Sequence, residues 1–234
     1  MVIRDMKGGA LNKILIENVL ISVFNKDGLE ELVPSLMDAN PGVRFMSTGG
    51  TYKKIKKMLG DDAGDHLIKV SEYTDFPEMD GGLVKTLHPK IHAGLLGERS
   101  NPEHQKYLAE TLDGGVYIDM VVVNLYPFDE VTADETVPFE TARGHIDIGG
   151  PTMIRAGAKN FASCAVVCNP ADYGKLLEHI EENDGCTTLR QRLEYAVGVF
   201  ATTHEYDGHI SKFFNSKLDN LDEIAASYLA ADGE

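Results

Sequence analysis

The sequence predicts an α/β protein that is built around a mostly parallel sheet. Residues 18–24 and 120–125 are nearly continuous apolar runs, which is typical of strands that are buried on both faces. Apolar residues recur at helical spacing over residues 29–37, and similar helical patterns separate the later strands. Strands that alternate with helices along a chain favour a parallel sheet with right-handed crossovers.

The other elements are expected in the following order. Strands are predicted at residues 18–24, 43–47, 66–70, 120–125 and 163–168. Helices are predicted at residues 29–37, 52–59, 101–112, 136–143, 149–160, 170–183 and 189–214. No stretch has the composition of a linker, so a single domain is expected over residues 1–234. It would include an N-terminal arm at 1–17 and a helical C-terminal tail at 216–234.

The composition restricts the class of protein. The formal net charge of −15 argues against nucleic acid or an anionic membrane as the main partner, because both require a basic surface. The three cysteines form no Cys-x-x-Cys pair, which predicts reduced thiols and no zinc site. Residues 1–17 lack the apolar run of a signal peptide, and no stretch approaches the ~20 apolar residues of a membrane span. A cytoplasmic protein is therefore expected.

Residues 76–97 show neither a helical nor a strand period and are expected to form an ordered loop. Its centre is Lys85-Thr86-Leu87-His88-Pro89, and ordered loops on a rigid scaffold often carry function. His88 and His92 have the spacing of a metal-binding pair. However, Pro89 argues against a regular helix there, and no third ligand is placed to complete a site. The prediction is that the protein holds no metal.

A phosphate cradle is expected at the carboxyl ends of the first two strands, where open α/β sheets bind ligands. Thr48-Gly49-Gly50-Thr51 follows the second strand and precedes a helix, so its backbone N–H groups could face a phosphate. Ser22 and Lys26 follow the first strand. The alternative is an ordinary tight turn. No Walker lysine motif or dinucleotide fingerprint is present.

Two further segments carry candidate reactive groups. Tyr126 follows the strand that ends near Asn124, where its hydroxyl could stabilise an oxyanion or simply pack at the rim. Asp147 precedes the helix expected at 149–160 and could cap it or act in a site. Lys159 follows twelve residues later, roughly 18 Å away if the intervening chain is helical. One small site could use both residues only if the helix starts later, the chain doubles back, or two subunits build the site.

These motifs together resemble the IMP cyclohydrolase family, which in many organisms is the N-terminal part of the bifunctional purine biosynthesis protein with AICAR transformylase. The resemblance covers roughly residues 18–215. It is carried, in order, by Ser22-Val23 with Lys26, Ser47-Thr48-Gly49-Gly50-Thr51, Phe76-Pro77-Glu78-Met79, Val84-Lys85-Thr86-Leu87-His88-Pro89, Asn124-Leu125-Tyr126-Pro127-Phe128, Asp147-Ile148-Gly149-Gly150 and Ala158-Lys159-Asn160.

The resemblance implies a hydrolase of cyclic amidines. It would close 5-formamidoimidazole-4-carboxamide ribonucleotide (FAICAR) to IMP and water, the last step of purine biosynthesis. It also implies a methylglyoxal-synthase-like fold of three layers, with helices on both faces of the sheet, a homodimer and no cofactor. The catalytic group would be Lys85, Tyr126, Asp147 and Lys159. The ribose phosphate would contact Ser22, Lys26, Thr48, Gly49, Gly50, Thr51 and Thr86, and the base would contact Asn124, Ile148 and Gly149.

Two features depart from the family pattern. Leu83 stands where the family usually has arginine, which removes a cation near the expected phosphate. The chain also stops about where the transformylase domain would begin. Its acidic tail resembles no linker, which favours a complete single-activity enzyme over an excised domain.

Two other functions fit the same expected fold. A methylglyoxal-synthase-like lyase would need a carboxylate base for a triose phosphate and would not need the Asn124–Phe128 and Asp147–Gly150 segments. A non-catalytic nucleotide-sensing domain would not need the four proposed catalytic residues.

Overall fold

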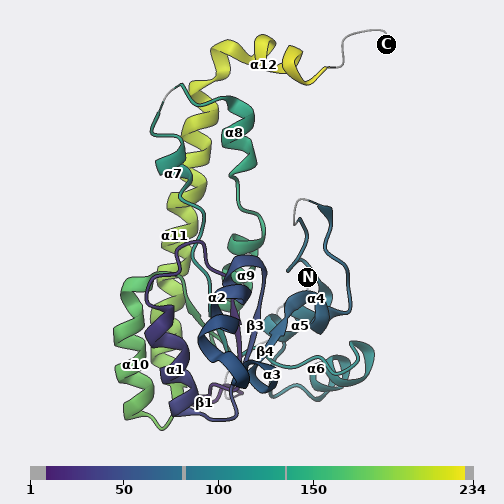
Figure 1. Ribbon diagram of the computed structural model, residues 1–234, viewed down its shortest axis with the longest axis vertical. Coiled ribbons are helices and arrows are strands. Elements are labelled where there is room, and N and C mark those ends of the chain that lie inside the picture. Colours follow the sequence, from purple (N-terminus) through teal and green to yellow (C-terminus); the bar gives the residue numbers. More distant parts are fainter. Residues whose placement is uncertain (1–8, 81–82, 135, 230–234) are drawn as a thin grey trace. The chain divides into compact units, whose positions relative to one another are not determined.

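The computed structural model describes residues 9–80, 83–134 and 136–229 (Figure 1). Its main sheet has five strands, all parallel, in the order β4-β3-β2-β5-β6. This confirms the predicted fold class. The strands are β2 (Asn18–Ile21), β3 (Arg44–Ser47), β4 (Leu67–Lys69), β5 (Met120–Val122) and β6 (Ala165–Val167).

Helices cover both faces of this sheet, which gives the expected three layers. Successive strand residues point to opposite faces, so Val19 and Ile21 pack into one core and Leu20 into the other. The first core includes residues of α1 (Leu29–Ala39), α2 (Gly49–Leu59) and α10 (Tyr173–Glu182). The second includes residues of α5 (Pro89–Leu96), α9 (Gly149–Lys159) and the first part of α11 (Leu189–Ser216).

Short elements complete this part of the chain. They are α3 (Ala63–His66), α4 (Val70–Thr74), α6 (Pro102–Lys106), a π-helical turn at Tyr107–Thr111, and single 3₁₀ turns at Gly60–Asp62 and Pro170–Asp172. The helix predicted at 101–112 is therefore α6 followed by the π-helical turn. Asn101 caps α6 as expected, because its side chain accepts a hydrogen bond from the Glu103 N–H at 3.0 Å.

The expected loop at 76–97 is shorter than predicted, because α5 occupies residues 89–96. Pro89 does not prevent this helix but begins it. It occupies the first turn, where a missing N–H costs nothing. His88 is the N-cap, and its Nδ1 accepts a hydrogen bond from the Lys90 N–H at 3.1 Å. The prediction that residues 89–96 form a loop was wrong, because a proline at the first helical position was interpreted as a helix breaker.

A small antiparallel sheet, which was not predicted, joins β1 (Lys13–Leu15) to β7 (Cys186–Thr188). Arg192 is fully buried beside it. Its guanidinium donates to the backbone oxygens of Leu11, Thr187 and Phe161 at 2.5, 2.8 and 2.9 Å. Part of the expected N-terminal arm is therefore a strand that is bound to the start of α11, whereas residues 1–8 lie outside the described residues.

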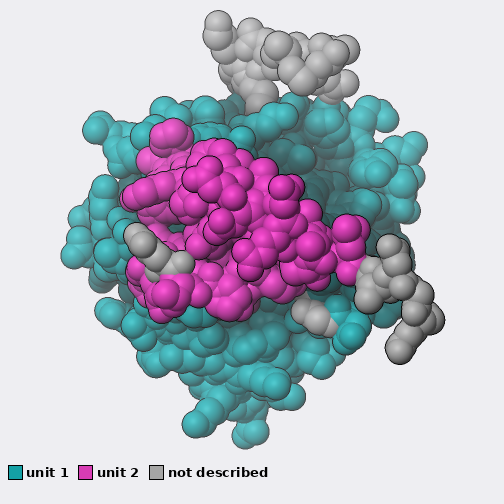
Figure 2. All heavy atoms as spheres, turned by 90° about the horizontal axis from the view of Figure 1, so that it is seen from above, with its two compact units in different colours: residues 1–125, 148–200 teal, residues 126–147, 201–234 magenta. Residues whose placement is uncertain are grey.

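The described chain divides into two compact units, which Figure 2 shows in different colours. Unit 1 comprises residues 1–125 and 148–200 and contains both sheets; unit 2 comprises residues 126–147 and 201–234. The expectation of a single domain stays a prediction. Among the described residues, no helix is both long and apolar enough to cross a membrane.

Unit 2 is helical in its described residues. It contains α7 (Phe128–Val131), α8 (Phe139–Gly144), the second part of α11, a 3₁₀ turn at Leu218–Asn220 and α12 (Leu221–Tyr228). Aromatic rings form its interior: Phe213 contacts Phe128 and Phe139 at centroid distances of 5.8 and 6.2 Å. Edge and stacked contacts of this kind stabilise a small core beyond the burial of area.

Candidate functional site

Five segments that are distant in the sequence meet at the carboxyl edge of the main sheet in unit 1. They are residues 22–26, 48–51, 85–86, 124–125 and 148–149. The first, second and fourth of these follow parallel strands directly, and such strands deliver their carboxyl ends to one edge of a sheet. The sequence predicted this convergence for the segments after β2 and β3.

The first two segments are joined by hydroxyl groups. The Oγ of Ser22 and the Oγ1 of Thr48 lie 3.0 Å apart and share a hydrogen bond. The Thr51 hydroxyl accepts from the Val23 N–H at 3.1 Å and donates to the Val23 carbonyl at 3.0 Å. Thr51 is 3% exposed, so its side chain fixes the segment after β2 instead of facing a ligand.

Positive charge gathers where α2 begins. Gly49 has φ +48° and is the first residue of this eleven-residue helix, whose N-terminus carries the positive end of the helix dipole. A Cβ on Gly49 would lie 3.8 Å from the Lys85 Nζ, and one on Gly50 would lie 3.5 Å from the Lys26 Cε. Two ammonium groups therefore flank a helix N-terminus, an arrangement that suits an anion.

Asn124 uses its side chain to shape this edge. Its Oδ1 accepts from the N–H groups of Phe24 and Asn25 at 2.7 and 2.9 Å, and its Nδ2 donates to the Asn25 carbonyl at 2.8 Å. These three bonds bind the segment after β2 to the end of β5. The residue expected to contact a base is thus also the residue that orders the Ser22–Lys26 segment.

The segment before α5 places Lys85 at this edge. Its ammonium group forms an ion pair with the Glu78 carboxylate at 3.0 Å, and the Lys85 side chain is 26% exposed. Leu83, where the resemblance leads us to expect arginine, is 60% exposed. Glu78 lies in the Phe76–Met79 motif, yet it was not predicted as a site residue. The signal that could have identified Glu78 is that its carboxylate lies close in the sequence to a candidate catalytic lysine.

Thr86 and α9 pack closely next to this lysine. A Cβ on Gly149 would lie 3.0 Å from the Thr86 Oγ1, which is a tight contact, so glycine suits this close approach. Burial lowers the pKa of His92 on α5 and outweighs the opposing effect of its hydrogen bond to the Thr86 backbone. Ile148, the other expected base contact, is 61% exposed. Thr86 is thereby fixed between α5 and the start of α9.

The four expected catalytic residues are divided between the units. Lys85 and Lys159 lie in unit 1, and Tyr126 and Asp147 lie in unit 2. Tyr126 is 46% exposed. The Asp147 backbone N–H donates to the hydroxyl of Tyr206 at 2.7 Å, and that hydroxyl donates to the His145 carbonyl at 3.4 Å. The buried Tyr206 therefore fixes the backbone on which the Asp147 carboxylate is carried.

Lys159 lies at the opposite end of α9 from Gly149. The helix is continuous from Gly149 to Lys159, and at 1.5 Å per residue its two ends are about 15 Å apart. Two of the three ways in which one site could use both Asp147 and Lys159 are therefore wrong. The helix does not start later than expected, and the chain does not double back between residues 149 and 159. Asn160 anchors this end, because its buried Nδ2 donates to the carbonyls of Leu95 and Gly97 at 2.8 and 3.0 Å. Within unit 1, Lys159 is therefore separated from Lys85 and the α2 N-terminus.

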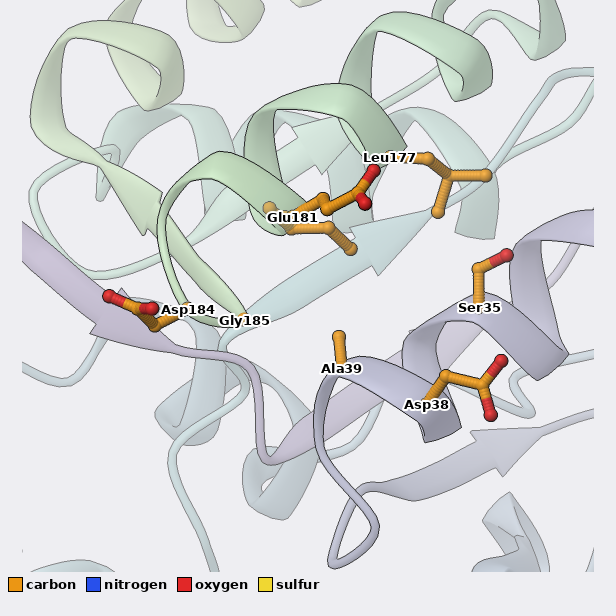
Figure 3. A pocket seen from close by; sticks show the side chains of 8 residues that line it. Ser35, Asp38, Ala39, Leu177, Glu181, Asp184 and Gly185 are labelled. Atoms are coloured by element: carbon orange, nitrogen blue, oxygen red, sulfur yellow. The ribbon is translucent and has the colours of Figure 1, made fainter.

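A separate pocket of about 390 Å³ lies between α1 and α10 (Figure 3). Its carboxylates, Asp38, Glu181 and Asp184, make it unsuited to a phosphate. The pocket adjoins the C-terminal end of α1, where the chain has returned to the amino edge of the sheet. It includes none of the predicted site residues. Among the described residues, no cluster of His, Cys, Asp and Glu side chains has the arrangement of a metal site.

Comparison with known proteins gives matches over nearly the whole chain. The MGS-like domain family matches residues 28–152, and the AICARFT/IMPCHase bienzyme family matches residues 157–232. The bifunctional purine biosynthesis protein PurH of Magnetococcus marinus is 46% identical over 205 residues, which are 88% of this chain and 37% of that protein. PurH of Ruminiclostridium cellulolyticum is 43% identical over 208 residues, 89% of this chain and 38% of its own length.

The chain thus spans less than two-fifths of these curated relatives. A solved structure titled "Crystal structure of ForH" has a TM-score of 0.70 and 29% sequence identity. The match covers 85% of this chain and 98% of that one.

Proposed function

The chain belongs to the MGS-like domain family, and we propose that it is an IMP cyclohydrolase, which closes FAICAR to IMP and water. Its similarity to bifunctional purine biosynthesis proteins supports an activity in that pathway. The observation that carries the proposal is the meeting of Ser22, Thr48, Lys26 and Lys85 around the N-terminus of α2. This arrangement fits a ribonucleotide phosphate held beside a reactive lysine.

The phosphate would bind at the start of α2. The helix dipole, the Lys26 ammonium and the paired hydroxyls of Ser22 and Thr48 supply positive potential and hydrogen-bond donors. Gly49 and Gly50 leave room for phosphate oxygens to approach the backbone. Thr86 and Gly149 lie on the next wall, and with Asn124 and Ile148 they would contact the ribose and the base. No cofactor is part of this proposal.

Ring closure joins the carboxamide nitrogen of the substrate to its formyl carbon. The nitrogen is a weak nucleophile, so holding the two groups in contact supplies much of the rate acceleration. As the new C–N bond forms, the formyl oxygen becomes negative, and Lys85 and Tyr126 would stabilise it. The nitrogen then loses its proton and the hydroxyl leaves as water. Asp147 and Lys159 would act as the acid and base of these two steps.

The position of Lys159 favours a site that two copies of the chain build together. Lys159 is exposed and about 15 Å along α9 from Gly149. A second copy could supply its Lys159 to the cradle of the first, which also gives the expected homodimer a catalytic role. Mixing inactive Lys85→Met and Lys159→Met variants should then restore roughly a quarter of wild-type activity, because half of the dimers would hold one intact site. No recovery after subunit exchange would show that each copy builds its own site.

Activity of single variants tests the assignment of residues. Lys85→Met and Asp147→Asn should each reduce the turnover of FAICAR by about 100-fold or more, measured by the absorbance of IMP. Lys106→Met is the matched control, because Lys106 is an exposed lysine paired with Glu110 on the surface of unit 1. Full activity of either site variant would overturn its assigned role.

Methylglyoxal synthase activity is the competing reaction on this fold. It would release methylglyoxal and phosphate from a triose phosphate. Offering dihydroxyacetone phosphate to the protein should give no methylglyoxal above the uncatalysed rate. We also propose a cytoplasmic location. The proposed partners are the nucleotide and a second copy of the chain. The net charge of −15 supports the exclusion of nucleic acid as a partner.

A further inference from the structure

The geometry points to Glu78 as a positioning residue for Lys85, an inference that rests on the proposed function. The Glu78 carboxylate lies 3.0 Å from the Lys85 ammonium, and the two side chains are 40% and 26% exposed. Both belong to unit 1. The pair is more sheltered than the surface pair of Lys106 and Glu110, whose side chains are 65% and 69% exposed. Partial burial reduces the screening that weakens surface ion pairs.

A second contact holds the same two segments together. The ring of Phe76 lies 5.7 Å from the ring of His88, between centroids. His88 is itself fixed as the N-cap of α5. Residues 76–78 thus lie against residues 85–88 through one ring contact and one ion pair. The segment before α5 is therefore held at two points, at Lys85 by Glu78 and at His88 by Phe76.

The backbone next to Lys85 requires such support. Val84 has φ +62°, in the left-handed region that a β-branched residue rarely occupies. Such a conformation persists only where the surroundings determine it. Val84 and Leu83 are 50% and 60% exposed, so their own packing does little to hold this turn. The ion pair on the following residue, Lys85, can do so directly.

The consequence is a fixed direction for the Lys85 ammonium. The Lys85 ammonium lies between the Glu78 carboxylate and the start of α2. An ammonium group has three N–H donors, so Lys85 can bind both Glu78 and a substrate. The ion pair with Glu78 restrains the ammonium from moving onto the phosphate. Glu78 would therefore affect the chemical step through Lys85 and leave phosphate binding largely unchanged.

A double-mutant cycle tests this role. Glu78→Gln keeps the shape of the side chain but removes its charge. It should lower kcat for FAICAR about 10-fold and change KM less than twofold, and Glu78→Asp should recover part of the loss. In the Lys85→Met background, Glu78→Gln should cause no further loss. Glu110→Gln, which breaks the exposed pair with Lys106, is the control and should leave kcat unchanged. Additive losses, or a loss confined to KM, would overturn the inference.

A second measurement does not depend on turnover. Limited reductive methylation, followed by mass spectrometry of peptides, reports how available each lysine is. Glu78→Gln should make Lys85 react several-fold faster, whereas Glu110→Gln should change Lys106 less than twofold. An unchanged Lys85 rate in a folded Glu78→Gln variant would overturn the positioning role. If the wild type makes no IMP but Lys85 still responds, the proposed function fails and the Glu78–Lys85 pair stands.

Discussion

Leu83 stands where the family resemblance leads us to expect arginine, and its exposure makes this difference testable. The side chain is 60% exposed and lies two positions before Lys85. Leu83→Arg should lower the KM for FAICAR several-fold, because a cation near the phosphate adds favourable electrostatic energy. Initial rates over a range of substrate concentrations measure this.

The matched control for this prediction is Val197→Arg. Val197 is 66% exposed on α11 in unit 1, so the variant adds the same charge to the same unit at a different site. It should leave KM unchanged. An equal KM in the wild type and Leu83→Arg would argue that residue 83 has no part in phosphate binding.

His92 predicts a pH dependence of stability. Burial lowers its pKa from the ordinary value of 6.5, so the folded protein keeps His92 neutral while the unfolded chain still takes up a proton. Stability is therefore present above pH 6.5 and is lost as pH falls from there through the lowered pKa. The melting temperature should fall less between pH 7.5 and 5.5 in His92→Gln than in the wild type.

His204→Gln is the control for this pH effect, because His204 is an exposed histidine on α11. It should follow the wild-type profile. If His92→Gln and the wild type showed the same dependence of melting temperature on pH, burial of His92 would not be coupled to folding.

Residue types and their order predicted that residues 48–51 join a strand to a helix, but they could not assign what each side chain bonds. Thr48–Thr51 was predicted from a strand, two glycines and a helix that follow one another. By contrast, the Asn124 side chain holds backbone about a hundred residues earlier in the chain, and the Thr51 hydroxyl bonds Val23. Such long-range partners leave no local pattern in a sequence.

At the scale of elements, strands with continuous apolar runs were predictable and short edge elements were not. All five strands of the main sheet fall within the predicted ranges, and β2, β5 and β6, which are buried along their whole length, carry the clearest apolar patterns. β1 and β7 have three residues each and alternate in burial, which is too short a pattern to recognise. α5 was missed because Pro89 can either end a helix or begin one, and its cap, His88, is an uncommon type for that position.

The packing of α9 on the sheet gives an element-scale prediction. A Cβ on Gly157 would lie 2.6 Å from the Val166 Cγ2 and 3.2 Å from the Cys164 Sγ. Gly157→Ala should therefore destabilise the protein by about 1–3 kcal/mol through overpacking. Because α9 carries Gly149 and Lys159 at its two ends, the variant should also lower activity. Denaturant unfolding measures the change in the free energy of unfolding.

Gly198→Ala in α11 is the matched comparison. Apart from its chain neighbours and the backbone of its own helix, no described atom lies within 4 Å of a Cβ at Gly198. The same substitution there should stabilise by about 0.5–1 kcal/mol, because alanine favours a helix over glycine. A Gly157→Ala variant as stable as Gly198→Ala would show that α9 does not pack tightly against β6.

At the scale of the whole molecule, the fold and the proposed function rest on different kinds of evidence. The parallel sheet follows from apolar patterning alone, whereas the proposed function depends on seven motifs in a specific order. The division into two units, with Tyr126 and Asp147 in one and Lys85 and Lys159 in the other, could not be predicted. No composition change marks residues 126 and 147 as boundaries, and the boundary between residues 200 and 201 lies inside the continuous helix α11.

Turnover of FAICAR by the purified wild-type chain tests the proposed cyclohydrolase activity directly. FAICAR should be consumed and IMP should appear in equal amount, without added metal or cofactor, at a rate that is proportional to protein concentration. Tight binding of IMP with no conversion of FAICAR above the uncatalysed rate would contradict it. That result would indicate that the protein is a nucleotide-binding domain and not an enzyme.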